Sequence, residues 1–210
     1  MAKMEIVPAA GRGSLSEKGL RQIEKILKVA ARLFNKKGYL ETNMDDISAA
    51  AKVSKGGIYH YFSSKDEILF FMLTNYMDTI LHNLEEDLQG FPDASSKIHF
   101  IIRRHITLYT QHLHEAKTLL HEAHCLPARF YRIIAEKQRE YYRIVAGSIT
   151  EFLGGEGRVK RSKITVVVFM LFGMCNWIYS WYDPRGEVGP DDLAEIIWTL
   201  FLKGVEEFKV

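Results

Sequence analysis

The chain has 210 residues, and 47% of them are apolar, which is enough for a well-buried core without disulfide or metal support. Its two cysteines, Cys125 and Cys175, have neither metal-ligand nor redox-motif spacing, so a reducing, cytoplasmic setting is expected. Residues 1–16 are polar and lack the apolar segment of a secretory signal, and we expect a mobile arm there.

The overall net charge of +2 is distributed unevenly along the chain. Residues 1–65 contain twelve Lys or Arg and six Asp or Glu, a net charge of +6. Residues 66–210 contain sixteen Lys or Arg and twenty Asp or Glu, a net charge of −4. A phosphate-rich partner is therefore expected to bind the first part of the chain.

The first third of the chain predicts one long helix and two short ones. An amphipathic helix with apolar residues from Leu20 to Phe34 is expected to end near Gly38. A short helix with a capping box formed by Thr42 and Asp45 follows, and Ser54 is the expected N-cap of a third helix.

The rest of the chain also shows helical periodicity, without a strand pair joined by a hairpin turn. Ser64 and Glu67 form a capping box that opens a helix expected to reach Gly90. A further helix is expected over 96–114, followed by a shorter one. Three more are expected: from Pro127 to the glycines at 154 and 155, over the uncharged stretch 164–182, and from Pro190 onward. The predicted fold class is all-α.

Two short helices joined by a tight turn after a longer helix are typical of a DNA-binding helix-turn-helix. Gly56 and Gly57 would let backbone N–H groups at the start of the third helix approach phosphate oxygens. The candidate DNA-binding residues are Thr42, Lys52, Ser54, Lys55, Gly56, Gly57, Tyr59, His60, Tyr61 and Lys65. Plain solvation is the alternative for Lys65, and a compact three-helix bundle with a basic solvated face is the alternative for the whole segment.

The segment from about residue 17 to residue 70 resembles the TetR/AcrR family of transcriptional repressors. The matching positions are Ile26-Leu27, Ala30, Leu33-Phe34, Gly38-Tyr39, Thr42, Met44-Asp45-Asp46-Ile47, Val53-Ser54-Lys55-Gly56, Ile58-Tyr59, Tyr61-Phe62 and Ser64-Lys65-Asp66. The resemblance implies a homodimer that binds palindromic double-stranded operator DNA and is released by a small-molecule effector. It also implies a helix-turn-helix domain at 17–64, after the arm at 1–16, and a larger helical effector-binding and dimerisation domain at 65–210.

Aromatic residues concentrate in the C-terminal part, where ordinary packing competes with a role in a ligand pocket. The candidate effector-binding residues are Arg103, Tyr109, Tyr141, Phe172, Asn176 and Trp177. Asn176, a polar residue within an apolar helix, is the candidate orienting group. Arg103, Arg104, Arg132, Arg139 and Arg143 are available for phosphates, with a solvated face as the alternative.

The run Gly173-Met174-Cys175-Asn176-Trp177, with Trp181-Tyr182-Asp183-Pro184 and Gly186, resembles TetR-family members that sense acyl-CoA thioesters. The implied effector is an acyl-CoA, and the alternative is a regulator of efflux that responds to a lipophilic compound. The helix from Lys65 to Gly90 is expected to link the domains, so that ligand packing tilts it and changes the separation of the two DNA-binding parts.

Three other classes of protein compete with a regulator. The stretch 164–182 is long enough to cross a membrane, but it contains Asn176 and, with the apolar stripe of 193–201, suits a four-helix dimer interface better. The histidines at 105, 112, 114, 121 and 124 suggest a metal but match no zinc motif, so no metal or cofactor is predicted. A nucleophile elbow, a phosphate-binding glycine loop and paired catalytic carboxylates are missing, which argues against an enzyme, including a metal-binding helical one. An architectural DNA-binding protein would not need so long a C-terminal part.

Overall fold

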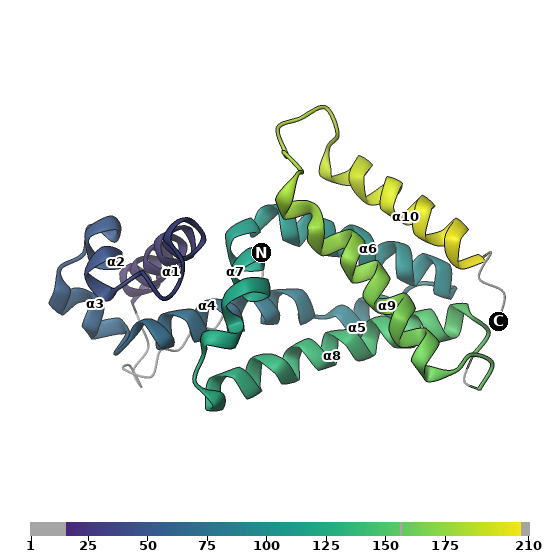
Figure 1. Ribbon diagram of the computed structural model, residues 1–210, viewed down its shortest axis with the longest axis horizontal. Coiled ribbons are helices and arrows are strands. Elements are labelled where there is room, and N and C mark those ends of the chain that lie inside the picture. The colour runs from purple at the N-terminus through teal and green to yellow at the C-terminus, as the bar shows by residue number, and fades with distance from the viewer. Residues whose placement is uncertain (1–15, 156, 207–210) are drawn as a thin grey trace. The chain divides into compact units, whose positions relative to one another are not determined.

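The computed structural model describes residues 16–155 and 157–206, and all regular elements in these ranges are helices (Figure 1). The predicted all-α fold is confirmed for this part of the chain. The chain divides into two compact units, one with the residues up to Thr79 and His114–Glu136, the other with Ile80–Leu113 and the residues from Lys137 onward. The predicted arm at 1–16 lies outside the described residues except for Ser16, whose hydroxyl accepts a hydrogen bond from the Gly19 N–H.

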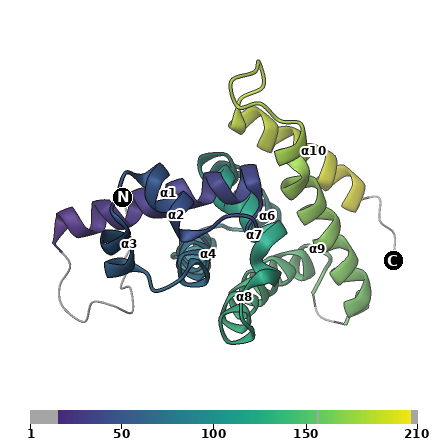
Figure 2. The same cartoon turned by 60° about the vertical axis from the view of Figure 1, so that its left-hand side comes forward.

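The first unit contains the three predicted N-terminal helices, α1 (Glu17–Lys37), α2 (Met44–Ala51) and α3 (Lys55–Tyr61), and most of α4 (Lys65–Leu81). Figure 2 shows α2 and α3 grouped with α1 beside the start of α4. Their apolar side chains form one small core, with Ile23, Ile26, Phe34, Ile47, Ile58, Phe62 and Ile68 fully buried. Helices of eight and seven residues owe their stability to such packing.

The start of α2 differs from the prediction. The capping box is formed by Asn43 and Asp46, not by Thr42 and Asp45. The Asp46 N–H donates to Asn43 Oδ1 at 2.9 Å, and the Asn43 N–H donates to Asp46 Oδ2 at 3.0 Å. Thr42 does not cap the helix because its hydroxyl donates to the Gly38 carbonyl inside the domain, at 2.7 Å.

The predicted long helix from Lys65 to Gly90 is helical over most of its length but is interrupted at residues 82 and 83. Ser64 caps α4 as expected, since its hydroxyl accepts from the Glu67 N–H at 3.2 Å, although the Glu67 carboxylate accepts from Ser63. The helix then ends at Leu81, and Asn83 adopts a left-handed conformation with φ of 53° before α5 (Leu84–Gln89). Asparagine tolerates this conformation better than most residues, so it permits the break.

The first unit also includes α7 (Leu113–Glu122), the 3₁₀ helix η1 (Ala123–Cys125) and the first turns of α8 (Ala128–Phe152). The Asn35 side-chain amide on α1 donates to the His114 carbonyl at 2.9 Å and to Thr118 Oγ1 at 2.8 Å. The rings of Phe70 and Phe130 stack with centroids 4.4 Å apart. The helix-turn-helix therefore belongs to a compact body larger than its own three helices.

The second unit is built around α6 (Ala94–Gln111), α9 (Arg161–Asn176) and α10 (Pro190–Glu206), with α5, most of α8 and the 3₁₀ helix η2 (Trp177–Ser180). Helix α10 packs against α6, where Arg103 pairs with Asp191 at 3.0 Å and His99 with Glu195 at 2.7 Å. Lys97 on α6 pairs with Glu151 on α8 at 2.8 Å.

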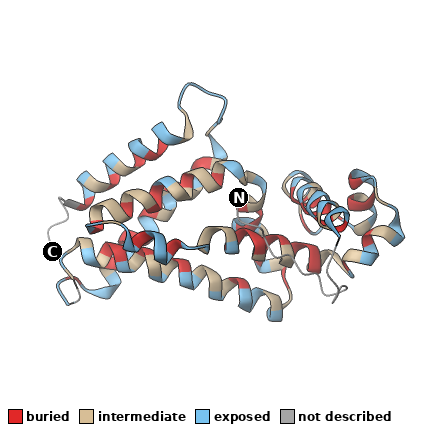
Figure 3. Ribbon diagram, turned by 180° about the vertical axis from the view of Figure 1, so that it is seen from behind, coloured by how far each residue is buried: buried red, intermediate tan, exposed pale blue. Residues whose placement is uncertain are grey.

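Among the described residues, one helical stretch, Arg161–Ser180, is long and apolar enough to cross a membrane by length and composition alone. It is not one continuous α-helix, because α9 ends at Asn176 and η2 follows. The apolar stripe predicted on 193–201 divides into buried Leu193, Ile197 and Phe201 and exposed Ile196 and Leu200. Buried and exposed residues thus alternate along α10 (Figure 3).

Candidate DNA-binding surface and effector site

Helix α3 presents a polar surface to solvent. Lys55, Gly56, Tyr59 and His60 are exposed, with Tyr59 at 52%, whereas Ile58 is fully buried. Neither the Tyr59 hydroxyl nor the His60 imidazole has a hydrogen-bond partner among the described residues. Tyr61 is half-buried, and its ring meets that of His60 edge to face, with centroids 4.9 Å apart. These groups can donate to phosphates and base edges in a major groove.

The turn between α2 and α3 fixes the start of α3. The Ser48 hydroxyl donates to the Val53 carbonyl at 2.6 Å, and the Val53 N–H donates to the Ser48 carbonyl at 3.0 Å. Ser54 is the N-cap, as predicted, because its hydroxyl accepts from the Gly57 N–H at 3.1 Å. Lys52, in a left-handed conformation with φ of 53°, is exposed at the end of α2.

Lys55 is paired across the turn. Its ammonium lies 2.6 Å from Asp45 Oδ2, and both side chains are well exposed. Hydrogen bonding to Asp45 raises the pKa of Lys55, which therefore stays charged at neutral pH. Because exposed ion pairs contribute little to stability, this pair can exchange its carboxylate for a phosphate at small cost.

The two glycines of α3 differ in their surroundings. A Cβ atom at Gly57 would lie 2.8 Å from Val53 Cγ1 and 3.1 Å from Ser54 Oγ, so packing in the turn requires glycine. A Cβ at Gly56 would meet nothing within 4 Å. Packing in the turn therefore favours glycine at position 57, whereas the described part of the structure does not require it at position 56.

Two of the predicted DNA-binding residues are engaged inside the domain. Thr42 is 1% exposed, and its hydroxyl is taken by the Gly38 carbonyl. The Lys65 ammonium donates to the backbone carbonyls of Tyr39, Leu40 and Thr42 at 2.8, 3.0 and 2.9 Å. The phosphate contacts of Thr42 and Lys65 stay predictions, and each donor would have to leave these internal carbonyls to make one.

Four of the six predicted effector-binding residues surround His105 on α6, in the second unit. His105 Nδ1 lies 2.9 Å from the Tyr141 hydroxyl, and Nε2 lies 3.0 Å from Asn176 Oδ1. The Tyr109 hydroxyl donates to the Asn176 carbonyl at 2.9 Å. Phe172 stacks on Tyr141 with centroids 5.5 Å apart. We call these five residues the His105 cluster.

The His105 ring is neutral at physiological pH. Burial among the surrounding protein atoms lowers its pKa from 6.5 to about 4, although the bond to Asn176 acts in the opposite direction. Because the Asn176 side-chain oxygen only accepts, the neutral ring carries its hydrogen on Nε2, and Nδ1 accepts from the Tyr141 hydroxyl. The cluster is thus uncharged, with aromatic faces and a few hydrogen-bonding groups.

The other two predicted effector residues lie outside the cluster. Arg103 is exposed and paired with Asp191, and Trp177 is 62% exposed with its ring edge on Tyr179. His105, the centre of this cluster, was not among the predicted effector residues because the histidines of this part of the chain suggested a metal. The sequence does place His105 on the same helix face as the predicted residue Tyr109, because residues four apart in a helix are neighbours on its surface.

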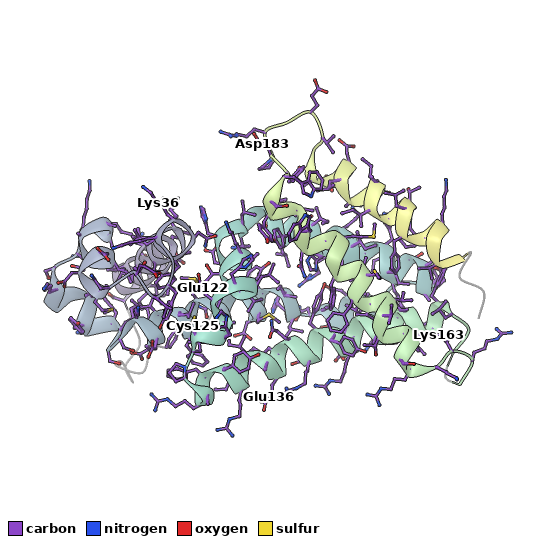
Figure 4. All side chains as sticks on the ribbon, viewed as in Figure 1. Lys36, Glu122, Cys125, Glu136, Lys163 and Asp183 are labelled. Carbon is purple, nitrogen blue, oxygen red and sulfur yellow. The ribbon has the colours of Figure 1, made fainter. Side chains whose placement is uncertain are left out.

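A metal site was the alternative for the histidines. Among the residues that the structure describes, no three His, Cys, Asp or Glu side chains are grouped so that they could hold a metal ion. Cys125 and Glu122 lie side by side, with 3.7 Å between sulfur and carboxylate oxygen (Figure 4). Burial, and then Glu122, raise the pKa of the Cys125 thiol, so the metal-binding thiolate is disfavoured.

Comparison with known proteins identifies the family. Residues 26–71 match the family model of bacterial regulatory proteins of the tetR family, and residues 92–205 match that of the tetracyclin repressor-like C-terminal domain. The chain belongs to the TetR family. It is therefore a transcriptional regulator with a DNA-binding domain, and the prediction against an enzyme is confirmed.

Solved TetR-family structures resemble most of the chain. A regulator from Bordetella parapertussis 12822 is 31% identical with a TM-score of 0.83, over 90% of this chain and 97% of that one. AibR, solved in complex with isovaleryl coenzyme A and operator DNA, is 26% identical with a TM-score of 0.73, over 85% and 97%. The regulator HbdR of Aromatoleum sp. (strain CIB) is 41% identical over 66 residues, which cover 31% of this chain and only 29% of that protein.

Substituting the two glycines separately tests their different roles. Gly56→Ala should raise the free energy of unfolding by up to about 1 kcal/mol, because alanine favours helix and the space is open. Gly57→Ala should be less stable than Gly56→Ala by about 1–3 kcal/mol, because its methyl group overlaps Val53. Urea unfolding followed by circular dichroism measures both, and equal stabilities would contradict the packing argument.

The neutral state of His105 predicts a pH dependence of stability. A histidine whose pKa is lower in the folded state stabilises the fold above its unfolded pKa of 6.5, and this stability is lost as the pH falls toward 4. Between pH 7.5 and pH 5.0 the expected loss is about 2 kcal/mol. In His105→Gln the free energy of unfolding should fall by about 2 kcal/mol less than in the wild type over the same pH range. Urea unfolding at both pH values measures the difference. The same loss in both proteins would mean that folding does not lower the pKa of His105.

Proposed function

We propose that this TetR-family regulator is a cytoplasmic, dimeric repressor that binds palindromic operator DNA through α3 and is released by a small molecule. The observation that carries the proposal is the exposed face of α3, where Lys55, Tyr59 and His60 lie around the open position of Gly56. Such a face suits a major groove, with lysine for phosphates and aromatic donors for base edges. Ser54, Gly57, Tyr61 and Lys52 complete the predicted contact set at its ends.

The dimer is proposed from an apolar surface of the second unit. Large apolar side chains are exposed on α9, on η2, just after η2, and on α10. They are Val166, Phe169, Met170, Trp177, Trp181, Ile196 and Leu200. Exposed apolar side chains on two helices that contact each other favour an interface, and a symmetric dimer would bury them against its own copy. This also accounts for the apolar composition of Arg161–Ser180 without a membrane.

The effector is proposed to contact the His105 cluster. Its neutral hydrogen-bonding groups and aromatic faces suit an apolar chain with a carbonyl group. The similarity to AibR, whose structure contains isovaleryl coenzyme A, supports an acyl-CoA thioester as the effector class. The uncharged cluster would equally accept a lipophilic compound, as in a regulator of efflux.

Operator binding is tested with a sequence selected from a random duplex pool. By fluorescence anisotropy, Tyr59→Ala should weaken operator binding by roughly 5- to 150-fold, the equivalent of about 1–3 kcal/mol for a base contact. Tyr131→Ala, an exposed tyrosine on α8, is the matched control and should bind as the wild type does. If no sequence is enriched, or if both variants bind normally, α3 is not the recognition helix.

The dimer interface is tested by Leu200→Glu, because Leu200 is 61% exposed and a carboxylate cannot be buried there without a partner. Light scattering should give the mass of a monomer for this variant and of a dimer for the wild type. Leu40→Glu, the same change at an exposed leucine between α1 and α2, should remain dimeric. A dimeric Leu200→Glu protein would place the interface elsewhere.

The effector class is tested with a panel of CoA thioesters and uncharged lipophilic compounds. A true effector must raise the melting temperature and weaken operator binding, because a ligand shifts an equilibrium only by its different affinity for the two states. Asn176→Leu should abolish both responses while operator binding is kept. Release by the lipophilic compounds alone would replace the acyl-CoA class.

A further inference from the structure

We infer that Arg104 is a positioning residue for the effector response: its guanidinium fastens the C-terminal end of α4 and helix α5 to α6, beside the His105 cluster. The inference rests on the proposed release of operator DNA by an effector that contacts this cluster. It goes beyond that proposal because it names the side chain that passes the effect of binding on to α4. In this role Arg104 contacts neither DNA nor effector.

The Arg104 guanidinium contacts three points of one short segment. Its Nη2 donates to the His82 carbonyl at 2.6 Å, and its Nε donates to the Ile80 carbonyl at 3.4 Å. Its Nη1 donates to Asp87 Oδ2 at 3.3 Å. The Arg104 side chain is only 22% exposed. One rigid, planar group thus binds the last turn of α4, the break after it and α5.

The end of α4 favours such a partner. The carbonyls of the last turn of a helix have no N–H partners within the helix, and the helix dipole favours a cation there. The last turn of α4 contains no basic residue, so Arg104 of α6 supplies the cation. The break follows directly, with Asn83 in its left-handed conformation and the His82 carbonyl bound to Arg104. The contacts that hold this break therefore come from α6.

Helix α6 joins these contacts to the His105 cluster. Arg104 and His105 are consecutive, so their side chains leave the helix about 100° apart. His105 is bound to Tyr141 of α8 and Asn176 of α9, whereas Arg104 is bound to the segment that contains the end of α4 and α5. A ligand that enters the cluster and displaces α6 therefore displaces the end of α4 through Arg104.

Helix α4 runs from one unit into the other. It begins at Lys65 in the first unit, which also contains α3, and its residues up to Thr79 belong to that unit. Its last two residues, Ile80 and Leu81, belong to the second unit with α6. Backbone hydrogen bonds run along the whole of a helix, so a shift at its end is carried to its start. Arg104 thus holds α4 at the point where this helix enters the second unit.

Three roles of Arg104 predict different measurements. Removal of a positioning residue leaves the affinity for operator and the affinity for effector nearly unchanged, but it removes the effect of one ligand on the other. Removal of a phosphate contact to a CoA effector weakens effector binding and keeps full operator release once the effector is saturating. Removal of a general stability residue lowers the melting temperature and weakens both affinities together.

The experiment compares Arg104→Met and Arg104→Lys with the control Lys97→Met. Lys97 is a cation on the same helix with a side chain 23% exposed, but its partner is Glu151 of α8. The probe is butyryl or palmitoyl coenzyme A, whichever releases more operator from the wild type. Anisotropy gives the operator affinity with and without saturating probe, and calorimetry gives the affinity for the probe.

The expected results separate coupling from binding. In the wild type and in Lys97→Met the probe should weaken operator binding by roughly 5- to 150-fold. In both Arg104 variants this factor should fall close to one, while the two separate affinities stay near those of the wild type. Lysine does not rescue the response, because one ammonium cannot reproduce the planar fork of donors.

Hydrogen exchange tests the attachment without any ligand. In Arg104→Met the backbone N–H groups of residues 82–89 should exchange about tenfold faster or more, while those of α9 and α10 exchange as in the wild type. Unchanged exchange over 82–89 would show that Arg104 does not hold this segment and would overturn the inference.

Two further results would overturn it. Full release at saturating probe, with probe affinity lowered about tenfold or more, would make Arg104 a contact of the effector. A lower melting temperature with both affinities weakened alike would make it a general stability residue. If neither probe releases operator from the wild type, the proposed acyl-CoA class fails instead, and hydrogen exchange still decides whether Arg104 holds the end of α4.

Discussion

Two helices of eight and seven residues cannot hold their orientation in water, so the DNA-binding surface depends on how they are attached to the rest of their unit. Burial of Ile47 and Ile58 attaches one side of each. The loop at 38–43, which joins α1 to α2, is attached to α4 by hydrogen bonds from the Lys65 ammonium to its backbone carbonyls. The exposed face of α3 can therefore take a partner, because the packing of α3 depends on the buried side of the helix and its one ion pair, Lys55–Asp45, is itself exposed.

The sequence predicts the helices of this unit well and their contacts less well. Apolar spacing and the Ser54 cap are local signals, and the structure confirms both. The capping residues of α2 could not be chosen from the sequence, because Thr42 with Asp45 and Asn43 with Asp46 have the same spacing. What decides is that Thr42 is buried in the folded domain, where its hydroxyl donates to the Gly38 carbonyl four residues earlier. The internal hydrogen bonds of Lys65 also have no local signal, since its acceptors lie more than twenty residues earlier in the chain.

In the second unit, composition predicted the character of the candidate effector site but not its centre. Tyr109, Tyr141, Phe172 and Asn176 were selected as aromatic or polar residues on apolar helices, and they meet around one point. That point is His105, whose pKa is lowered by the burial that packing provides. Arg103 was selected for its charge, and its pairing with Asp191, 88 residues away, has no local signal.

The central claim is that a symmetric dimer places two copies of α3 in successive major grooves of one operator. Interference by methylation of guanine N7, an atom of the major groove, tests it most directly. The account predicts two symmetric groups of interfering guanines whose centres are about one helical turn, roughly 10 base pairs, or a multiple of it apart. A single group, or normal binding to DNA methylated at every guanine, would contradict it.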